Sequence, residues 1–252
     1  EVICGRCGSK FDTFGEKPGI VFEDVFEAPA DNRPPLRFPR KRLESVGGTW
    51  RLQNYRLSKA WVEKFSKTGP FLDLGSGPRR NSELFKGKDV LYVDGARYVG
   101  VDIVCDFAKR LPIRDEAIAG ILCSNVLEHL PEPETCFDEM FRVLRPAGEA
   151  LVLVPFLFKL HQEPYDFHRY TRHALKWYAS RAGFRDARIV EVGNISNVLA
   201  EVLIQARKEA PSLAGRLSLA VQKGILRLSR SFSERVPASK VMPQGYAVYL
   251  QR

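Results

Sequence analysis

Short apolar runs alternate with helical segments through the middle of the chain. The apolar runs span 71–75, 89–95, 101–106, 117–124, 149–156 and 187–192. One connecting segment is predicted to be a helix because it starts at Pro133, carries an apolar face and stops at Gly148. Strands that are buried on both faces and connected by helices are typical of a mostly parallel sheet. The pattern therefore predicts an α/β fold.

The first of these runs leads into the glycine-rich sequence FLDLGSGPRRN (71–81). Glycines allow the backbone to turn tightly and to approach a ligand without a Cβ atom in the way. The carboxyl end of the first parallel strand faces the crevice in which open α/β sheets bind ligands. Arg80 stands where a dinucleotide-binding fingerprint has its third glycine, whereas Asp94 ends the next strand and can accept both hydroxyls of a ribose. A nucleoside without a pyrophosphate therefore fits this pattern better than a dinucleotide.

Five blocks between about residues 70 and 192 extend this pattern. They are DLGSG, the strand-end Asp94, CDFAKRLPIRD (105–115), ILCSNVLEHLPEP (121–133) and FRVLRPAGEALVLVPF (141–156). Together they resemble class I S-adenosylmethionine-dependent methyltransferases of the type 11 group. The resemblance implies an enzyme that uses S-adenosylmethionine and has a Rossmann-like, seven-stranded, mostly parallel sheet of order 3-2-1-4-5-7-6. The antiparallel last strand would be GYAVYLQR (245–252), which follows a helical insertion at 195–230.

The resemblance also implies which residues bind the cofactor. The methionine part would be held by Asp73, Gly75, Ser76 and Gly77, the ribose by Asp94, the adenine by Asp106 and Phe107, and the side near the sulfonium by Ser124 and Asn125. The chain departs from the family pattern at Ile118-Ala119, which replaces a Phe-Asp pair, and at Pro78-Arg79-Arg80, which replaces the third glycine. In the alternative interpretation, the glycines and carboxylates are only turn residues of the sheet.

Polar residues concentrate in the loop FLFKLHQEPYDFHRYT (156–171), which follows the fifth strand beside the cofactor crevice. We take His161, Asp166 and His168 as candidate catalytic residues, with His161 or His168 as the base if the acceptor must lose a proton. Alternatively, these side chains bond to one another and Thr171 caps the next helix. The loop resembles a methyltransferase subgroup associated with sugar or cell-surface polysaccharide metabolism. This implies a small-molecule acceptor or one linked to a carbohydrate or glycolipid.

The amino-terminal part of the chain differs in composition from the rest. Residues 1–27 contain Cys4 and Cys7, which resemble half of a small zinc ribbon. A structural zinc needs four ligands, so either a second pair has been lost upstream or the site is unused. A start at Glu1 rather than Met favours a fragment. Residues 28–50 are predicted to be a Pro/Arg-rich linker, and 51–252 the methyltransferase domain.

The net charge of +9 lies in the two flanks of the chain, because residues 71–190 carry 17 basic and 17 acidic side chains. This distribution disfavours a nucleic-acid partner and leaves a protein or an anionic membrane as partners for the basic flanks.

The apolar stretch 150–158 is about half a membrane span. Without a signal peptide, the sequence predicts a cytoplasmic protein, with membrane-peripheral association as an alternative. Two other functions stay open, an RNA methyltransferase and a catalytically silent partner protein that binds the cofactor.

Overall fold

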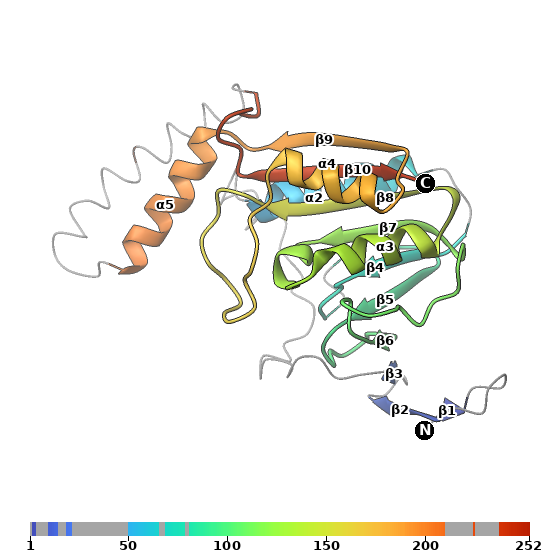
Figure 1. The fold of residues 1–252 in the computed structure, drawn as a ribbon. Coiled ribbons are helices and arrows are strands. Elements are labelled where there is room, and N and C mark those ends of the chain that lie inside the picture. Colours follow the sequence, from blue (N-terminus) through green and yellow to red (C-terminus); the bar gives the residue numbers. More distant parts are fainter. Residues whose placement is uncertain are drawn as a thin grey trace.

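The strands of the chain form one sheet in the computed structural model, which describes residues 2–3, 10–14, 19–21, 50–65, 69–78, 81–209, 224 and 237–252 (Figure 1). The strands are β1 (Val2–Ile3), β2 (Lys10–Phe14), β3 (Gly19–Val21), β4 (Phe71–Leu74), β5 (Val90–Asp94), β6 (Ile103–Val104), β7 (Ile118–Ser124), β8 (Leu144–Pro155), β9 (Asp186–Val192) and β10 (Gly245–Gln251). Neighbouring strands follow the order β1-β2-β3-β6-β5-β4-β7-β8-β10-β9.

The part of the sheet from β6 to β9 has the predicted arrangement. Its order, β6-β5-β4-β7-β8-β10-β9, corresponds to the expected 3-2-1-4-5-7-6. β4 pairs in parallel with β5 and β7, and β8 pairs in parallel with β7. β10 runs antiparallel to both neighbours, with Val248 opposite Val152 of β8 and Ile189 of β9. The predicted α/β fold is confirmed, and the parallel strands end at the edge of the sheet where β10 begins.

Apolar side chains cover both faces of the sheet, because alternate residues of a strand point to opposite sides. Val152 of β8 belongs to the apolar cluster that contains Phe137 of α3 (Pro133–Val143). Its neighbour Leu151 belongs to a second cluster, around Trp61 of α2 (Trp50–Lys64). α3 and α4 (Arg172–Arg181) therefore cover one face and α2 covers the other (Figure 1). The double burial explains why these strands are apolar throughout.

Two of the helices begin where local sequence signals indicate. α3 begins at Pro133, as predicted from the proline, but it ends at Val143 rather than at Gly148, because β8 already begins at Leu144. Thr171 caps α4, since its side chain accepts a hydrogen bond of 3.2 Å from the backbone N–H of Ala174. α2 begins at Trp50, whose side chain is buried, whereas Tyr55 in the same helix is 36% exposed.

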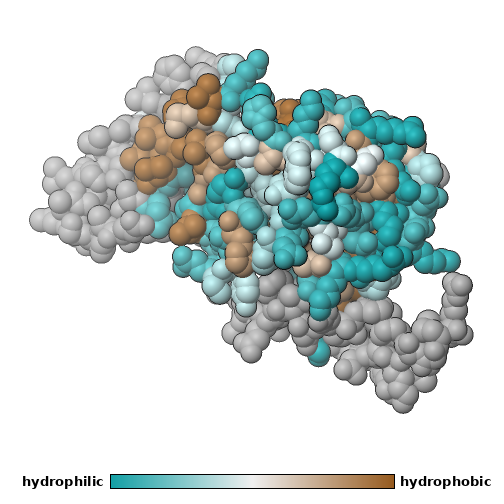
Figure 2. Space-filling view, in the orientation of Figure 1, coloured by the Kyte–Doolittle hydropathy of each residue, from teal (hydrophilic) through white to brown (hydrophobic). Residues whose placement is uncertain are grey.

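The predicted insertion at 195–230 begins with a helix, α5 (Ile195–Glu209). Its Ile195, Leu199 and Val202 side chains are 50%, 43% and 57% exposed, and Figure 2 shows apolar surface gathered around this helix. The second predicted helix of the insertion, residues 28–49 of the predicted linker, and Cys4 and Cys7 lie outside the described residues. Within the described part of the chain, no helix is long and apolar enough to cross a membrane.

Candidate active site

The glycine-rich turn after β4 combines left-handed backbone conformations with close contacts to β5 and to the segment that follows β7. Gly75 has φ +76° and Gly77 has φ +53°, which is the left-handed region that favours glycine. The Gly75 N–H donates a hydrogen bond of 2.8 Å to the carbonyl of Val93 in β5. A Cβ atom on Gly75 would lie 2.1 Å from a methyl group of Val126, just after β7. The turn therefore brings the ends of β4, β5 and β7 together, and only glycine fits at position 75.

The Asp94 carboxylate is fixed at the end of β5 by two backbone N–H groups. One oxygen accepts a hydrogen bond of 2.7 Å from Gly77, and the other accepts one of 3.0 Å from Ala96. These bonds tie the carboxylate to the glycine-rich turn while the residue stays half-buried. This is the place at which the sequence predicts the ribose of the cofactor.

Asp73 has a different environment, although it lies on the neighbouring strand. Its side chain is almost fully buried and accepts a hydrogen bond of 3.2 Å from the side-chain amide of Asn81. Burial raises the pKa of Asp73 to about 7, with a further increase from the charge of Asp94, and the Asn81 hydrogen bond opposes the rise. A substantial fraction of Asp73 is therefore protonated at neutral pH, which the sequence alone did not indicate.

The two residues predicted to hold the adenine follow β6. Asp106 accepts a hydrogen bond of 2.8 Å from the backbone N–H of Ala108, so that its carboxylate is oriented at the end of the strand. Phe107 is only 5% exposed and packs within the apolar cluster that also contains Val93. The ring therefore supports this end of the sheet and offers little open surface in this conformation.

Helix α2 contributes two residues to the site that the sequence analysis missed. Asn125 has φ +56°, and its side-chain oxygen accepts hydrogen bonds from the Trp50 indole at 2.5 Å and from Asn54 at 3.3 Å. The Asn125 amide donates in turn to the hydroxyl of Ser124 at 3.1 Å. The predicted methionine side of the site is thus oriented from a helix that precedes β4. No motif around Trp50 announces this contact, because the partners are 75 positions apart.

The loop after β8 is organised around an ion pair. The two Asp166 oxygens accept hydrogen bonds of 2.6 and 2.7 Å from Arg169, whose guanidinium also binds the carbonyl of Lys159 at 2.9 Å. Burial would raise the pKa of Asp166, but the hydrogen bonds from Arg169 and from the His161 backbone hold it at about 2. Asp166 is therefore ionised at neutral pH and holds the loop in place.

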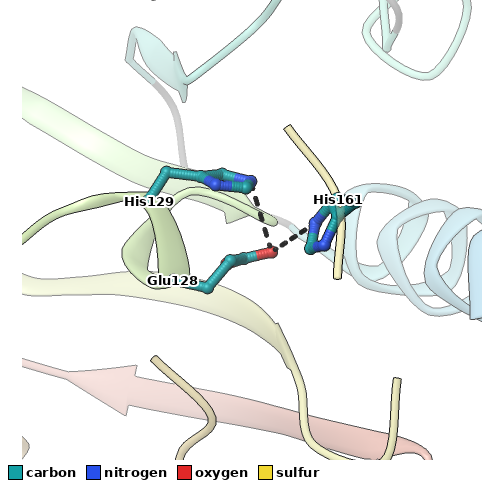
Figure 3. A group of neighbouring side chains, drawn as sticks. All are labelled: Glu128, His129 and His161. Carbon is teal, nitrogen blue, oxygen red and sulfur yellow. Dashed lines mark ion pairs between the residues drawn. The ribbon is translucent and has the colours of Figure 1, made fainter. Parts of the chain in front are cut away.

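One of the two candidate bases lies in a cluster with a buried carboxylate. Nε2 of His161 is 3.6 Å from Oε1 of Glu128, and Nε2 of His129 is 3.8 Å from the same oxygen (Figure 3). Glu128 and His129 belong to the short 3-10 helix η1 (Leu127–His129), which follows β7. His168 instead contacts the carbonyl of Pro131 through Nε2, at 3.1 Å. The segment LEHLP contained Glu128, but nothing in the sequence linked it to His161.

Comparisons with known proteins agree with this architecture. Residues 72–152 match the family model described as a methyltransferase domain. An uncharacterized methyltransferase of Mycobacterium sp. (strain KMS) is 34% identical over 92 residues, which are 32% of this chain and 36% of that protein. Cycloartenol-C-24-methyltransferase 1 of Oryza sativa subsp. japonica is 31% identical over 72 residues, which are 27% of this chain and 21% of that protein. The matches thus span about a third or less of these relatives.

A structural match covers more of the chain. The crystal structure of an S-adenosylmethionine-dependent methyltransferase from Archaeoglobus fulgidus superimposes with a TM-score of 0.54 and 18% identity, over 81% of this chain and 95% of that one. At this identity the match shows the fold alone. It confirms the predicted Rossmann-like fold, and the family model places a methyltransferase-domain match within that fold.

Proposed function

We propose that this chain, whose residues 72–152 match a methyltransferase-domain model, is a class I enzyme that transfers a methyl group from S-adenosylmethionine to a small-molecule acceptor. We further propose that this acceptor is a carbohydrate or is linked to a carbohydrate or glycolipid. The observation that carries the first proposal is the glycine-rich turn at Gly75, packed against Val126 and joined to Asp94 through the Gly77 N–H.

The residues at this edge of the sheet fit the cofactor. Asp94 offers carboxylate oxygens for the ribose hydroxyls, and the missing Cβ at Gly75 lets the turn pack against Val126 at the carboxyl end of the strands, where such sheets bind ligands. Ser124 and Asn125, which are oriented from Trp50, would line the methionine side. When bound, the cofactor supplies the electrophilic methyl group. The protein then contributes mainly by holding donor and acceptor in line, which alone can remove a large part of the barrier.

The loop after β8 is the proposed acceptor side. Leu160, Tyr165 and Phe167 are 68%, 44% and 46% exposed there, and they offer apolar and aromatic surface beside the polar cluster around His161. The related rice protein acts, by its name, on cycloartenol, a small molecule. The balance of 17 basic and 17 acidic side chains over residues 71–190 gives the sheet region no net attraction for a polyanion. These features support a small, uncharged acceptor over RNA.

The cofactor site is tested by calorimetric titration of the chain with S-adenosylmethionine and, separately, with NAD. We expect micromolar binding of the first ligand only, and a loss of at least tenfold, or about 1.4 kcal/mol, in the Asp94→Ala variant. Asp89→Ala is the matched control, because this exposed carboxylate lies just before the start of the same strand. A folded protein that binds neither ligand would contradict the proposal.

The acceptor class is tested by measuring S-adenosylhomocysteine release with free sugars, a glycolipid and a short RNA. Release with a sugar or glycolipid is the expected result. Release with RNA alone would contradict the acceptor class while leaving the reaction intact. Cofactor binding without release by any acceptor would favour the catalytically silent partner.

A further inference from the structure

Glu128 is a fully buried carboxylate that Arg169 reaches electrostatically but that no donor hydrogen-bonds among the described residues. Its side chain is 0% exposed, and neither carboxylate oxygen has a hydrogen-bond partner among the described residues. A buried charged group without hydrogen bonds is strongly destabilising, because it has lost its hydration. In a folded protein such a group is usually paired with a cation or coordinates a metal ion.

The two nearest imidazoles stand at distances that suit shared metal coordination. Nε2 of His161 and Nε2 of His129 lie 3.6 and 3.8 Å from Oε1 of Glu128, beyond hydrogen-bond length. One ligand atom from each of the three residues falls within a span of 4.8 Å (Figure 3). Ligands bonded to one ion at about 2.0–2.2 Å are themselves roughly 3–4 Å apart. A small shift of one ring would bring all three atoms to that distance from a single ion.

The other nitrogen of each ring lies close to an oxygen atom, and for His129 this oxygen accepts a hydrogen bond. Nδ1 of His129 is 2.6 Å from the carbonyl of Tyr165, which can only accept, so this nitrogen carries the proton. Nδ1 of His161 is 3.3 Å from Asp166, at ion-pair distance but without hydrogen-bond alignment. Asp166 is itself held by Arg169. Metal-binding histidines almost always have a carbonyl or carboxylate in this position, which fixes the tautomer and the ring orientation.

We propose that Glu128, His129 and His161 bind a divalent transition-metal ion such as Zn²⁺. Two imidazoles and one carboxylate form a ligand set that leaves coordination positions open, as catalytic sites require. The set joins η1, which follows Ser124 and Asn125 along the chain, to the loop after β8. The cation would therefore lie between the proposed cofactor and the proposed acceptor.

A metal ion bound by Glu128, His129 and His161 indicates which chemical group accepts the methyl group. This inference about the acceptor rests on the proposed methyl transfer. A hydroxyl group in an open position loses its proton to solvent more easily, because the cation lowers its pKa. The oxygen then forms a bond to the methyl carbon while the carbon–sulfur bond breaks, and the bonding pair stays on sulfur. The products are a methyl ether, S-adenosylhomocysteine and one proton. The acceptor is thus a hydroxyl compound, and two adjacent hydroxyls, as in sugars, could occupy two open positions.

The test is a titration of the metal-free chain with Zn²⁺ by calorimetry and with Co²⁺ by visible absorption. The Cys4→Ser/Cys7→Ser background removes the thiolates that would otherwise compete for either ion. We expect one equivalent to bind at micromolar concentration or tighter, and Glu128→Gln and His161→Gln each to weaken binding at least 100-fold. His173→Gln is the matched control, because this histidine is exposed on α4.

The outcomes separate this proposal from the proposed function. A folded chain that binds no stoichiometric metal, or a folded Glu128→Gln variant with unchanged affinity, would overturn the metal site. If Glu128→Gln does not fold, the metal affinity of His129→Gln is compared with that of the Cys4→Ser/Cys7→Ser protein instead. Unchanged affinity in folded His129→Gln would then overturn the metal site. S-adenosylmethionine affinity, measured on the metal-free chain, should be retained in Glu128→Gln. Cofactor binding without metal binding refutes only the inference, and the reverse result refutes only the proposed function.

Discussion

Replacement of Gly75 by alanine tests whether the glycine-rich turn is required by packing as well as by backbone conformation. At φ +76° an alanine is in the left-handed region, which costs about 1–2 kcal/mol. Its Cβ would also lie 2.1 Å from Cγ2 of Val126, so that the buried valine must move. Overpacking of this kind costs about 1–3 kcal/mol. The free energy of unfolding should therefore fall by about 2–5 kcal/mol in Gly75→Ala.

Gly87→Ala separates the two contributions. Gly87 has a similar φ of +79°, but a Cβ there would meet nothing within 4 Å. It should lose only the conformational part, about 1–2 kcal/mol. A second comparison adds Val126→Ala, which removes the methyl group that clashes. In that background Gly75→Ala should cost at least about 1 kcal/mol less than in the original protein.

Urea denaturation followed by circular dichroism measures all four variants and the parent chain at one pH. The reasoning fails if Gly75→Ala and Gly87→Ala lower the free energy of unfolding equally and Val126→Ala does not change the cost of Gly75→Ala. Calorimetry with S-adenosylmethionine on the folded variants adds a functional comparison. Gly75→Ala should weaken binding of the cofactor, whereas Gly87→Ala should not.

Three further predictions concern single side chains. Because burial raises the pKa of Asp73 to about 7, the folded state binds its proton more tightly than the unfolded state, so stability should fall as pH rises from about 4 to 7. Relative to Asp73→Asn, the original protein should lose about 2 kcal/mol between pH 5 and 7 in urea denaturation, and parallel pH profiles would contradict the raised pKa. Trp50→Phe keeps the aromatic packing but removes the hydrogen-bond donor to Asn125. Calorimetry should therefore show S-adenosylmethionine affinity reduced by about fivefold. Unchanged affinity would disprove the inference that Trp50 orients Asn125 for the cofactor. Thr171→Ala removes the α4 cap and should lower thermal stability by about 1 kcal/mol, whereas Thr171→Ser should not.

The sheet could be predicted because its information is local in the sequence. Each apolar run is a strand, and the turn at Gly75 and the carboxylate of Asp94 lie directly at strand ends, where the parallel arrangement must gather them. The capping role of Thr171 is also visible from the sequence, since it depends on residues within one helical turn.

The contacts that complete the candidate site could not be predicted in this way. Trp50 reaches Asn125 across 75 positions, from a helix whose amino-terminal turn had no apolar periodicity to reveal it. Glu128 and His161 come together only because η1 and the loop after β8 follow adjacent strands of the sheet. Periodicity and motif spacing describe one segment at a time, whereas these pairs depend on how the loops fold over the sheet edge.

The pairing of β9 with β10 holds the two ends of the segment between them side by side. The chain leaves the sheet at Val192 and returns at Gly245, and these two residues are directly opposite each other. A backbone hydrogen bond of 2.8 Å from Gln244 to Val192 closes the same junction. Topologically, 193–244 is the loop of a hairpin, and the entropy of closing a hairpin loop grows only with the logarithm of its length, by roughly 0.6 kcal/mol per doubling. Evolution can therefore lengthen, shorten or exchange the segment between these two ends without altering the register of β9 and β10.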